Sequence, residues 1–137
     1  MINLRSSAYT RTHPLNPEAL RELGVAGNST FTEFYERYEG PFSSTKTGFC
    51  LLDLETFDPL GSVLESTRSA RRQFDWPARF LVITDLLGNG VYVYETVTDK
   101  VFNVDFEGGD KALVSGELPP EFDSFEEFLV WYFEGEF

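Results

Sequence analysis

His13 and Cys50 are the residues from which nucleophilic catalysis would have to be built, since each is the only residue of its type in the chain. A catalytic Cys or Ser needs a neighbouring base, and His13 is the only histidine available for that role. His13 precedes Pro14 in a segment without periodic pattern, where a solvent-exposed side chain is the simpler interpretation. Cys50 lies in an apolar run, where cysteine behaves as a small buried hydrophobic residue. One Cys and one His also exclude a disulfide framework and a Cys/His zinc site.

Closely spaced carboxylates are the other candidate chemistry. They occur at Asp53 and Glu55, at Asp105 and Glu107, and at Glu126 with Glu127. On a strand the i, i+2 spacing places two carboxylates on one face, which would suit a metal ion or an acid/base pair. With 23 acidic residues in the chain, such pairs also arise by chance, and solvated edges explain them equally well. We therefore predict no catalytic residue, no metal site and no cofactor.

The charge distribution carries more information than these pairs. The net charge is −12, which argues against a nucleic-acid surface and against docking on an anionic membrane. Residues 1–37 are balanced, whereas residues 105–137 hold ten acidic side chains and one basic side chain, Lys111. Two interpretations remain open for this acidic end. It is either a solvated rim that keeps the protein soluble or an electrostatic footprint for a basic protein partner.

Candidate contact residues follow from the second interpretation, with carboxylates that steer the partner and aromatic side chains that anchor it. They are Tyr92, Tyr94, Asp105, Glu107, Asp110, Glu117, Glu121, Asp123 and Trp131. Trp131 lies off the main apolar stripe of the last predicted helix, as an interface residue would, although a buried contact under a loop is the alternative. Tyr92 and Tyr94 share one face of a predicted strand, which makes that face a candidate open aromatic surface.

The elements that must position these residues can be predicted from periodicity and capping residues. Helices are predicted from the cap Asn16 to Gly24, from the cap Thr30 to Gly40, from Asp58-Pro59 to Phe74, and from the cap Ser124 onward. Strands are predicted at 47–54, 80–83, 91–94 and 101–106, with a weak edge strand at 112–115. Gly88-Asn89-Gly90 leads into a strand and is read as a hairpin turn, and Gly108-Gly109 as a further turn.

The predicted architecture is one α+β domain over residues 1–137, with helices at both ends around a mainly antiparallel sheet. Residues 1–15 are expected to form a polar lead-in. The N-terminus has no apolar run typical of a secretory signal, and no stretch reaches the ~18 apolar residues of a membrane span. A soluble, cytoplasmic protein is therefore expected.

Several segments together resemble a known family. They are Phe34 to Gly40, Gly48-Phe49, Phe80-Leu81-Val82-Ile83, Gly90 to Tyr94, Lys100 to Asp105, and Asp123-Ser124-Phe125-Glu126-Glu127-Phe128-Leu129. In this order they resemble the SUKH superfamily, immunity proteins related to a fungal regulator of cell-wall assembly and glucan synthesis. The resemblance is strongest over residues 80–129 and extends more weakly back to about residue 16.

The resemblance implies a curved antiparallel sheet with helices packed on one side. It also implies a non-enzymatic immunity protein that binds and neutralises a bacterial toxin, frequently a nuclease, with no small-molecule substrate. Nucleases that grip phosphates are commonly basic, so an acidic inhibitor would mimic the polyanion. The alternative is a regulatory or scaffold module that binds a protein unconnected with toxins, as the fungal relatives suggest.

Overall fold

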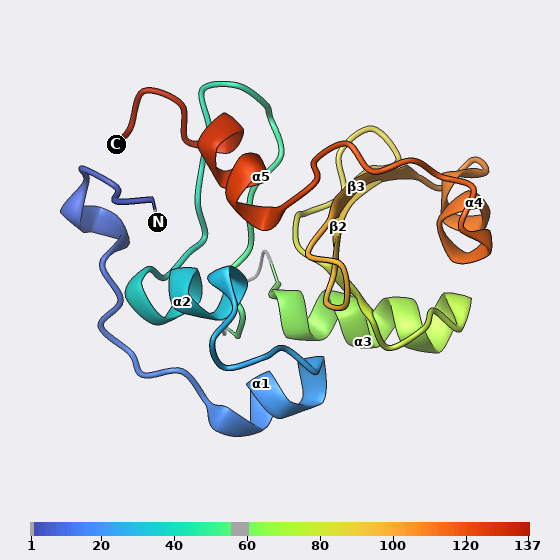
Figure 1. Cartoon of the computed structure of the whole chain (residues 1–137), viewed down its shortest axis with the longest axis horizontal. Coiled ribbons are helices and arrows are strands. Elements are labelled where there is room, and N and C mark those ends of the chain that lie inside the picture. The colour runs from blue at the N-terminus through green and yellow to red at the C-terminus, as the bar shows by residue number, and fades with distance from the viewer. Residues whose placement is uncertain (1, 56–60) are drawn as a thin grey trace.

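The computed structural model describes residues 2–55 and 61–137. Its elements are η1 (Ser7–Tyr9), α1 (Pro17–Leu23), α2 (Thr30–Arg37), α3 (Val63–Phe74), β1 (Phe80–Val82), β2 (Gly90–Glu95), β3 (Val101–Asp105), α4 (Gly109–Ser115) and α5 (Phe125–Tyr132). The α+β class with helices at both ends of the chain is confirmed (Figure 1). Among the described helices, none has the length and apolar character needed to cross a lipid bilayer.

The sheet has the order β1-β2-β3 with both pairs antiparallel. The three strands predicted at 80–83, 91–94 and 101–106 are confirmed, with ends that differ by about one residue. Asn89 takes a left-handed conformation (φ 71°) in the predicted turn before β2. The register places Val93 opposite Phe102 and Tyr94 opposite Val101, so alternate residues face opposite sides of the sheet.

Two of the predicted helix N-caps, Asn16 and Ser124, are confirmed. Asn16 accepts a hydrogen bond from the Glu18 N–H, and Ser124 accepts one from the Glu127 N–H. The prediction of Thr30 as a cap is wrong: Ser29 caps α2 by accepting from the Thr32 N–H. The Thr32 hydroxyl, like that of Ser29, donates to the Ala26 carbonyl, which ties the preceding turn to the helix.

The predicted start of α3 at Asp58-Pro59, with Leu60, lies outside the described residues. Within them α3 begins at Val63, and the Ser62 hydroxyl accepts from the Glu65 N–H.

The predicted strand at 47–54 is wrong. Leu51 makes only isolated bridges, to Phe42 and to Thr84. Beside the backbone bonds of Leu51 to Phe42 and of Leu52 to Ile83, two side chains bind this segment: the Tyr132 hydroxyl accepts from the Leu51 N–H, and the Tyr35 hydroxyl donates to the Leu52 carbonyl. These hydroxyls come from residues far away in the sequence, so the local pattern could not reveal them.

The predicted edge strand at 112–115 is also wrong, because these residues form α4. Gly108 adopts φ 128°, a conformation open chiefly to glycine, and Gly116 ends the helix in a left-handed conformation. The Asp105 carboxylate accepts from the Glu107 and Gly109 N–H groups and so closes the turn into α4. The helix buries only Gly109 and Leu113, too few positions to leave a helical period in the sequence.

Two hydrophobic clusters lie on the two faces of the sheet. The aromatic cluster is built around fully buried rings on α2, α5 and the loop between α2 and α3, namely Phe31, Phe34, Tyr35, Phe42, Phe125, Phe128, Tyr132 and Phe133, and includes Tyr92 and Tyr94 of the sheet. The distal cluster is Ala70, Trp76, Phe80, Val82, Val91, Val93, Phe102, Val104 and Leu113. Helices therefore lie on both faces, with α5 and α4 on opposite sides of β2 and β3 (Figure 1), rather than on the one side that the resemblance implies.

The N-terminal segment is more than a polar lead-in. Ile2 is buried in the aromatic cluster, and Leu4, Tyr9 and Leu15 pack against it. Arg11 forms an ion pair of 2.5 Å with the buried Asp53 and also donates to the Tyr35 and Tyr38 carbonyls. Residues 2–15 are thereby attached to α2 and to the loop that follows it.

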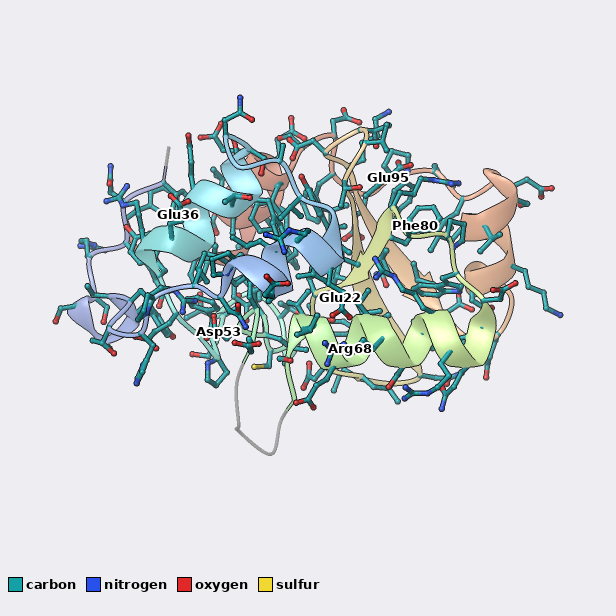
Figure 2. All side chains as sticks on the ribbon, turned by 90° about the horizontal axis from the view of Figure 1, so that it is seen from below. Glu22, Glu36, Asp53, Arg68, Phe80 and Glu95 are labelled. Atoms are coloured by element: carbon teal, nitrogen blue, oxygen red, sulfur yellow. The ribbon has the colours of Figure 1, made fainter. Side chains whose placement is uncertain are left out.

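A second ion pair attaches α1 to α3. The Arg68 guanidinium donates to both oxygens of Glu22, at 2.5 and 2.6 Å. Figure 2 shows the two side chains beside each other, on a side of the molecule where Asp53 is also labelled. Arg11 and Arg68 are therefore already paired with carboxylates of the same chain.

Candidate protein-binding surface

The six predicted carboxylates lie in two groups rather than one. Asp105, Glu107, Asp110 and Glu117 surround α4, whereas Glu121 and Asp123 precede α5. All are exposed except Asp110, which is half-buried. Phe122 pairs with Val101, the first residue of β3, and Asp105 is the last residue of β3. At ~3.3 Å per residue, Val101 and Asp105 lie about 13 Å apart. The two groups are therefore separate candidate surfaces.

Asp105 is exposed, and its carboxylate also stabilises the turn before α4. Its carboxylate accepts from the backbone N–H groups of Glu107 (2.9 Å) and Gly109 (3.3 Å). A Cβ atom added at Gly109 would stand 2.8 Å from this carboxylate. Asp105 therefore shapes the turn into α4, which removes it from the set of freely available partner contacts.

The prediction that Tyr92 and Tyr94 form an open aromatic surface is wrong. Tyr92 is 4 % exposed and Tyr94 2 %, because α5 covers this face of β2. Tyr94 packs between Phe31 (4.5 Å) and Phe125 (5.3 Å), and its hydroxyl donates to Asp99 at 2.8 Å. Burial raises the pKa of Tyr94, and the Asp99 carboxylate raises it further. Both tyrosines belong to the core.

Trp131 was predicted to be either an interface residue or a buried contact, and the structure shows a half-buried side chain. Its ring lies 5.2 Å from that of Phe122, 6.0 Å from that of Tyr92 and 6.1 Å from that of Phe128. Phe122 is itself half-buried and was not among the predicted contact residues. The Phe122 and Trp131 rings contact the core rings of Tyr92 and Phe128, and the other parts of both rings are exposed to solvent.

Local structure places carboxylates beside these two rings. The Phe122 carbonyl accepts from the Val101 N–H, which attaches the segment before α5 to the edge of the sheet. The Ser124 cap then starts α5, and Glu127 accepts from the Asp123 N–H at 3.0 Å. Glu121 contacts the Tyr92 hydroxyl and, together with burial, raises the pKa of that tyrosine. Glu127 lies four residues before Trp131, on the same side of α5.

We call Glu121, Phe122, Asp123, Glu127 and Trp131 the acidic–aromatic surface. Its three carboxylates are exposed, and within residues 2–55 and 61–137 none of them forms an ion pair with a basic side chain. Lys100 lies opposite Asp123 in the bridge register, yet it forms no ion pair with it. An arginine or lysine from outside could pack on the rings and pair with the carboxylates.

Asp53 and Glu55 do not form a pair. Asp53 is 5 % exposed, whereas Glu55 faces solvent. Burial raises the pKa of Asp53, and Arg11 opposes this rise. A pocket of about 240 Å³ lies beside them and is bordered by Arg11, His13 and Glu39. The Arg11 guanidinium and two backbone N–H groups already occupy the Asp53 carboxylate, so its arrangement serves the fold.

His13 and Cys50 lie in different surroundings. The His13 side chain is 83 % exposed and contacts Glu39 at 3.1 Å, as expected for a surface residue. Cys50 is half-buried, and its N–H donates to Asp85 at 2.8 Å. Among the described residues, no group of three His, Cys, Asp or Glu side chains is arranged to hold a metal ion.

Two residues were missed from the sequence: Phe122 in the candidate surface and Arg11 in the fold. Phe122 precedes the Ser124 cap by two positions, one position farther than the site directly before a cap at which hydrophobic residues contact the first turn, so its sequence signal is weak. Arg11 pairs with a residue 42 positions away, for which no local signal exists.

A scan against protein-family models and a search of curated proteins found no match to this chain. The function is therefore argued from the arrangement of the side chains. That arrangement is an exposed set of carboxylates around a half-buried aromatic pair.

Proposed function

We propose that this protein is a non-enzymatic binding protein that contacts a basic protein partner through the acidic–aromatic surface. The observation that carries the proposal is the placement of Glu121, Asp123 and Glu127 around the Phe122–Trp131 pair without cation partners. Aromatic residues with polar surroundings are typical energetic centres of protein interfaces. Carboxylates at the rim accelerate encounter with a basic surface and disfavour acidic partners.

The more specific form of the proposal is an immunity protein that neutralises a cognate toxin domain. It rests on the resemblance to the SUKH superfamily and on the net charge of −12. A nuclease binds phosphates with Lys and Arg, so an inhibitor that carries carboxylates over its binding surface competes for the same cations. The exposed carboxylates around Phe122 and Trp131 support this proposal, and the identity of the partner is the proposed part.

Co-expression with the C-terminal domain of the neighbouring open reading frame tests the specific form. Growth rescue by this protein is expected if the two form a toxin–immunity pair. Failure of rescue, together with binding to a host protein unconnected with toxins, would favour the regulatory or scaffold module instead.

Association kinetics with the partner test the surface itself. Glu121→Gln with Asp123→Asn keeps the hydrogen-bond acceptors and removes two charges, so the association rate should fall several-fold at low salt. Glu33→Gln with Glu36→Gln is the control for the loss of two charges, because both residues lie on α2 and outside this surface. Glu36, labelled in Figure 2, is exposed, and Glu33 is half-buried. Trp131→Phe should act mainly on the dissociation rate. An association rate that is insensitive both to salt and to the first pair of substitutions would exclude this surface.

A further inference from the structure

Large apolar side chains from the end of α3, the β1–β2 turn and α4 are exposed at one end of the molecule. Phe74 is 45 % exposed, Leu86 61 % and Val114 41 %. The Phe74 ring stacks on that of Phe106 at 5.3 Å, and Phe106 stacks on the buried Trp76 at 6.2 Å. We call Phe74, Leu86, Phe106 and Val114 the Phe74 surface. It continues the distal cluster outward to solvent, since both Trp76 and Phe106 contact that cluster.

The Phe74 surface contains two hollows. One, of about 440 Å³, lies between α3 and the turn that joins β1 to β2, with Ala70, Leu86 and Phe106 in its walls. The other, of about 380 Å³, lies between Phe74 and α4 and includes Val114. Phe74 borders both hollows and therefore separates them. Figure 1 shows the end of α3 and α4 at the same end of the molecule, away from α5.

Carboxylates predominate around this surface. Asp85 lies in the wall of the first hollow and Asp110 in that of the second. Three more acidic residues adjoin the aromatic rings in the sequence: Asp75, Asp105 and Glu107. The basic residues of the same segments are Arg71, Arg72 and Lys111, so acidic residues exceed them by five to three. The Arg71 guanidinium already donates to the carbonyls of Glu22 and Ala78.

The charge decides which occupant fits. A second copy of this chain would bring the same carboxylates face to face, and each copy carries a net charge of −12. A basic segment would instead pair with Asp85 and Asp110 while its apolar side chains enter the hollows.

We propose that the Phe74 surface is a second binding site, for a segment of another protein that presents two apolar side chains beside Lys or Arg. Each of the partner's two apolar side chains enters one hollow, with Phe74 between them. The site lies at the opposite end of β3 from the acidic–aromatic surface, and its existence does not depend on the proposed function.

Binding of synthetic peptides tests this site. The probes are short peptides that carry two leucines beside lysines, at helical and at extended spacings, with versions in which serine replaces leucine or glutamate replaces lysine. Amide chemical shifts should change at residues of α3, the β1–β2 turn and α4 for the leucine–lysine peptides. The serine and glutamate versions should bind about tenfold more weakly or worse, a difference of ~1.4 kcal/mol.

Matched variants locate the binding. Phe74→Ser should raise the dissociation constant about tenfold, whereas Val130→Ser should not, although Val130 on α5 has the same 45 % exposure. Glu121→Gln with Asp123→Asn should leave peptide binding unchanged, which separates this test from that of the proposed function.

Three outcomes would overturn the inference. They are equal binding by the Phe74→Ser variant, equal binding of the glutamate peptide, and a dimer in sedimentation that Phe74→Ser dissociates. The last outcome would identify a second copy as the occupant.

Discussion

The hydrophobic clusters on the two faces of the three-stranded sheet differ in how completely they are shielded from solvent. On one face the aromatic cluster is closed, since Phe31, Phe34, Tyr35 and Tyr132 are all 0 % exposed. On the other face the distal cluster is bounded by α3 and α4 and reaches solvent at Phe74. Aromatic rings occur on both faces, so residue type alone does not separate core from surface. What differs is the number of elements that cover each face.

Closure of the first face depends on long-range polar contacts as well as on rings. Arg11 and Asp53 attach the N-terminal segment, and the Tyr132 hydroxyl attaches the loop around Leu51. The second face has fewer elements over it, because α4 is one short helix and buries only Leu113 and Gly109. The apolar edge of this second face therefore stays exposed at Phe74.

Phe31→Ala should have the largest effect on stability. The ring lies 4.5 Å from Tyr94, 4.9 Å from Phe125 and 5.0 Å from Tyr35, so its removal leaves a cavity in the closed face. The free energy of unfolding, measured by urea denaturation, should fall by about 3–5 kcal/mol. A loss below about 1.5 kcal/mol would contradict the view that this face is tightly closed.

Arg11→Met should have the next largest effect, and that effect should depend on pH. At pH 7 the substitution leaves Asp53 as a buried carboxylate without its cation, at a cost of about 3 kcal/mol. Burial already raises the pKa of Asp53 in the folded state. Loss of Arg11 raises this pKa further, so protonation favours the folded variant and its deficit should shrink as the pH falls from 7 towards 4.

Urea denaturation of the Arg11→Met variant and the parent at both ends of this pH range measures the effect. An equal deficit at the two pH values would mean that Asp53 is not the group left unpaired.

Tyr132→Phe removes only a hydroxyl. This hydroxyl donates to the carbonyls of Phe42 (3.0 Å) and Phe49 (2.9 Å) and accepts from the Leu51 N–H (2.9 Å). The buried backbone groups lose their partner, so the free energy of unfolding should fall by about 2 kcal/mol. Tyr9→Phe is the control, because the Tyr9 hydroxyl contacts the exposed Ser43 and should change stability by less than about 0.5 kcal/mol.

Phe74→Ser should have the smallest effect on the isolated protein. About half of the Phe74 side chain is exposed and the rest contacts Phe106, so the free energy of unfolding should fall by about 1 kcal/mol. Thermal or urea denaturation is sufficient to detect a larger change. A loss comparable to that of Phe31→Ala would show that both faces are closed and that Phe74 belongs to the core.

Much of the local structure could be predicted, whereas the candidate surface could be predicted only in part. The caps Asn16 and Ser124 and the strands β1, β2 and β3 follow from patterns within a few residues. The exposed Glu121 and Asp123 follow from residue type, because a lone carboxylate is rarely buried. The burial of Tyr92 could not be predicted, because alternation within a strand shows two faces without showing whether a second layer covers each of them.

The sequence by itself determined the α+β class, the helix caps, the turn before β2 and the concentration of negative charge in residues 105–137. These properties depend on backbone preferences and on residue types, which act over one or two turns of chain. Only the tertiary structure decided that Arg11 meets Asp53, that tyrosine hydroxyls bind the backbone around Leu51, and that the carboxylates divide between the two ends of β3. Such contacts join residues tens of positions apart, so they form only when the whole chain packs.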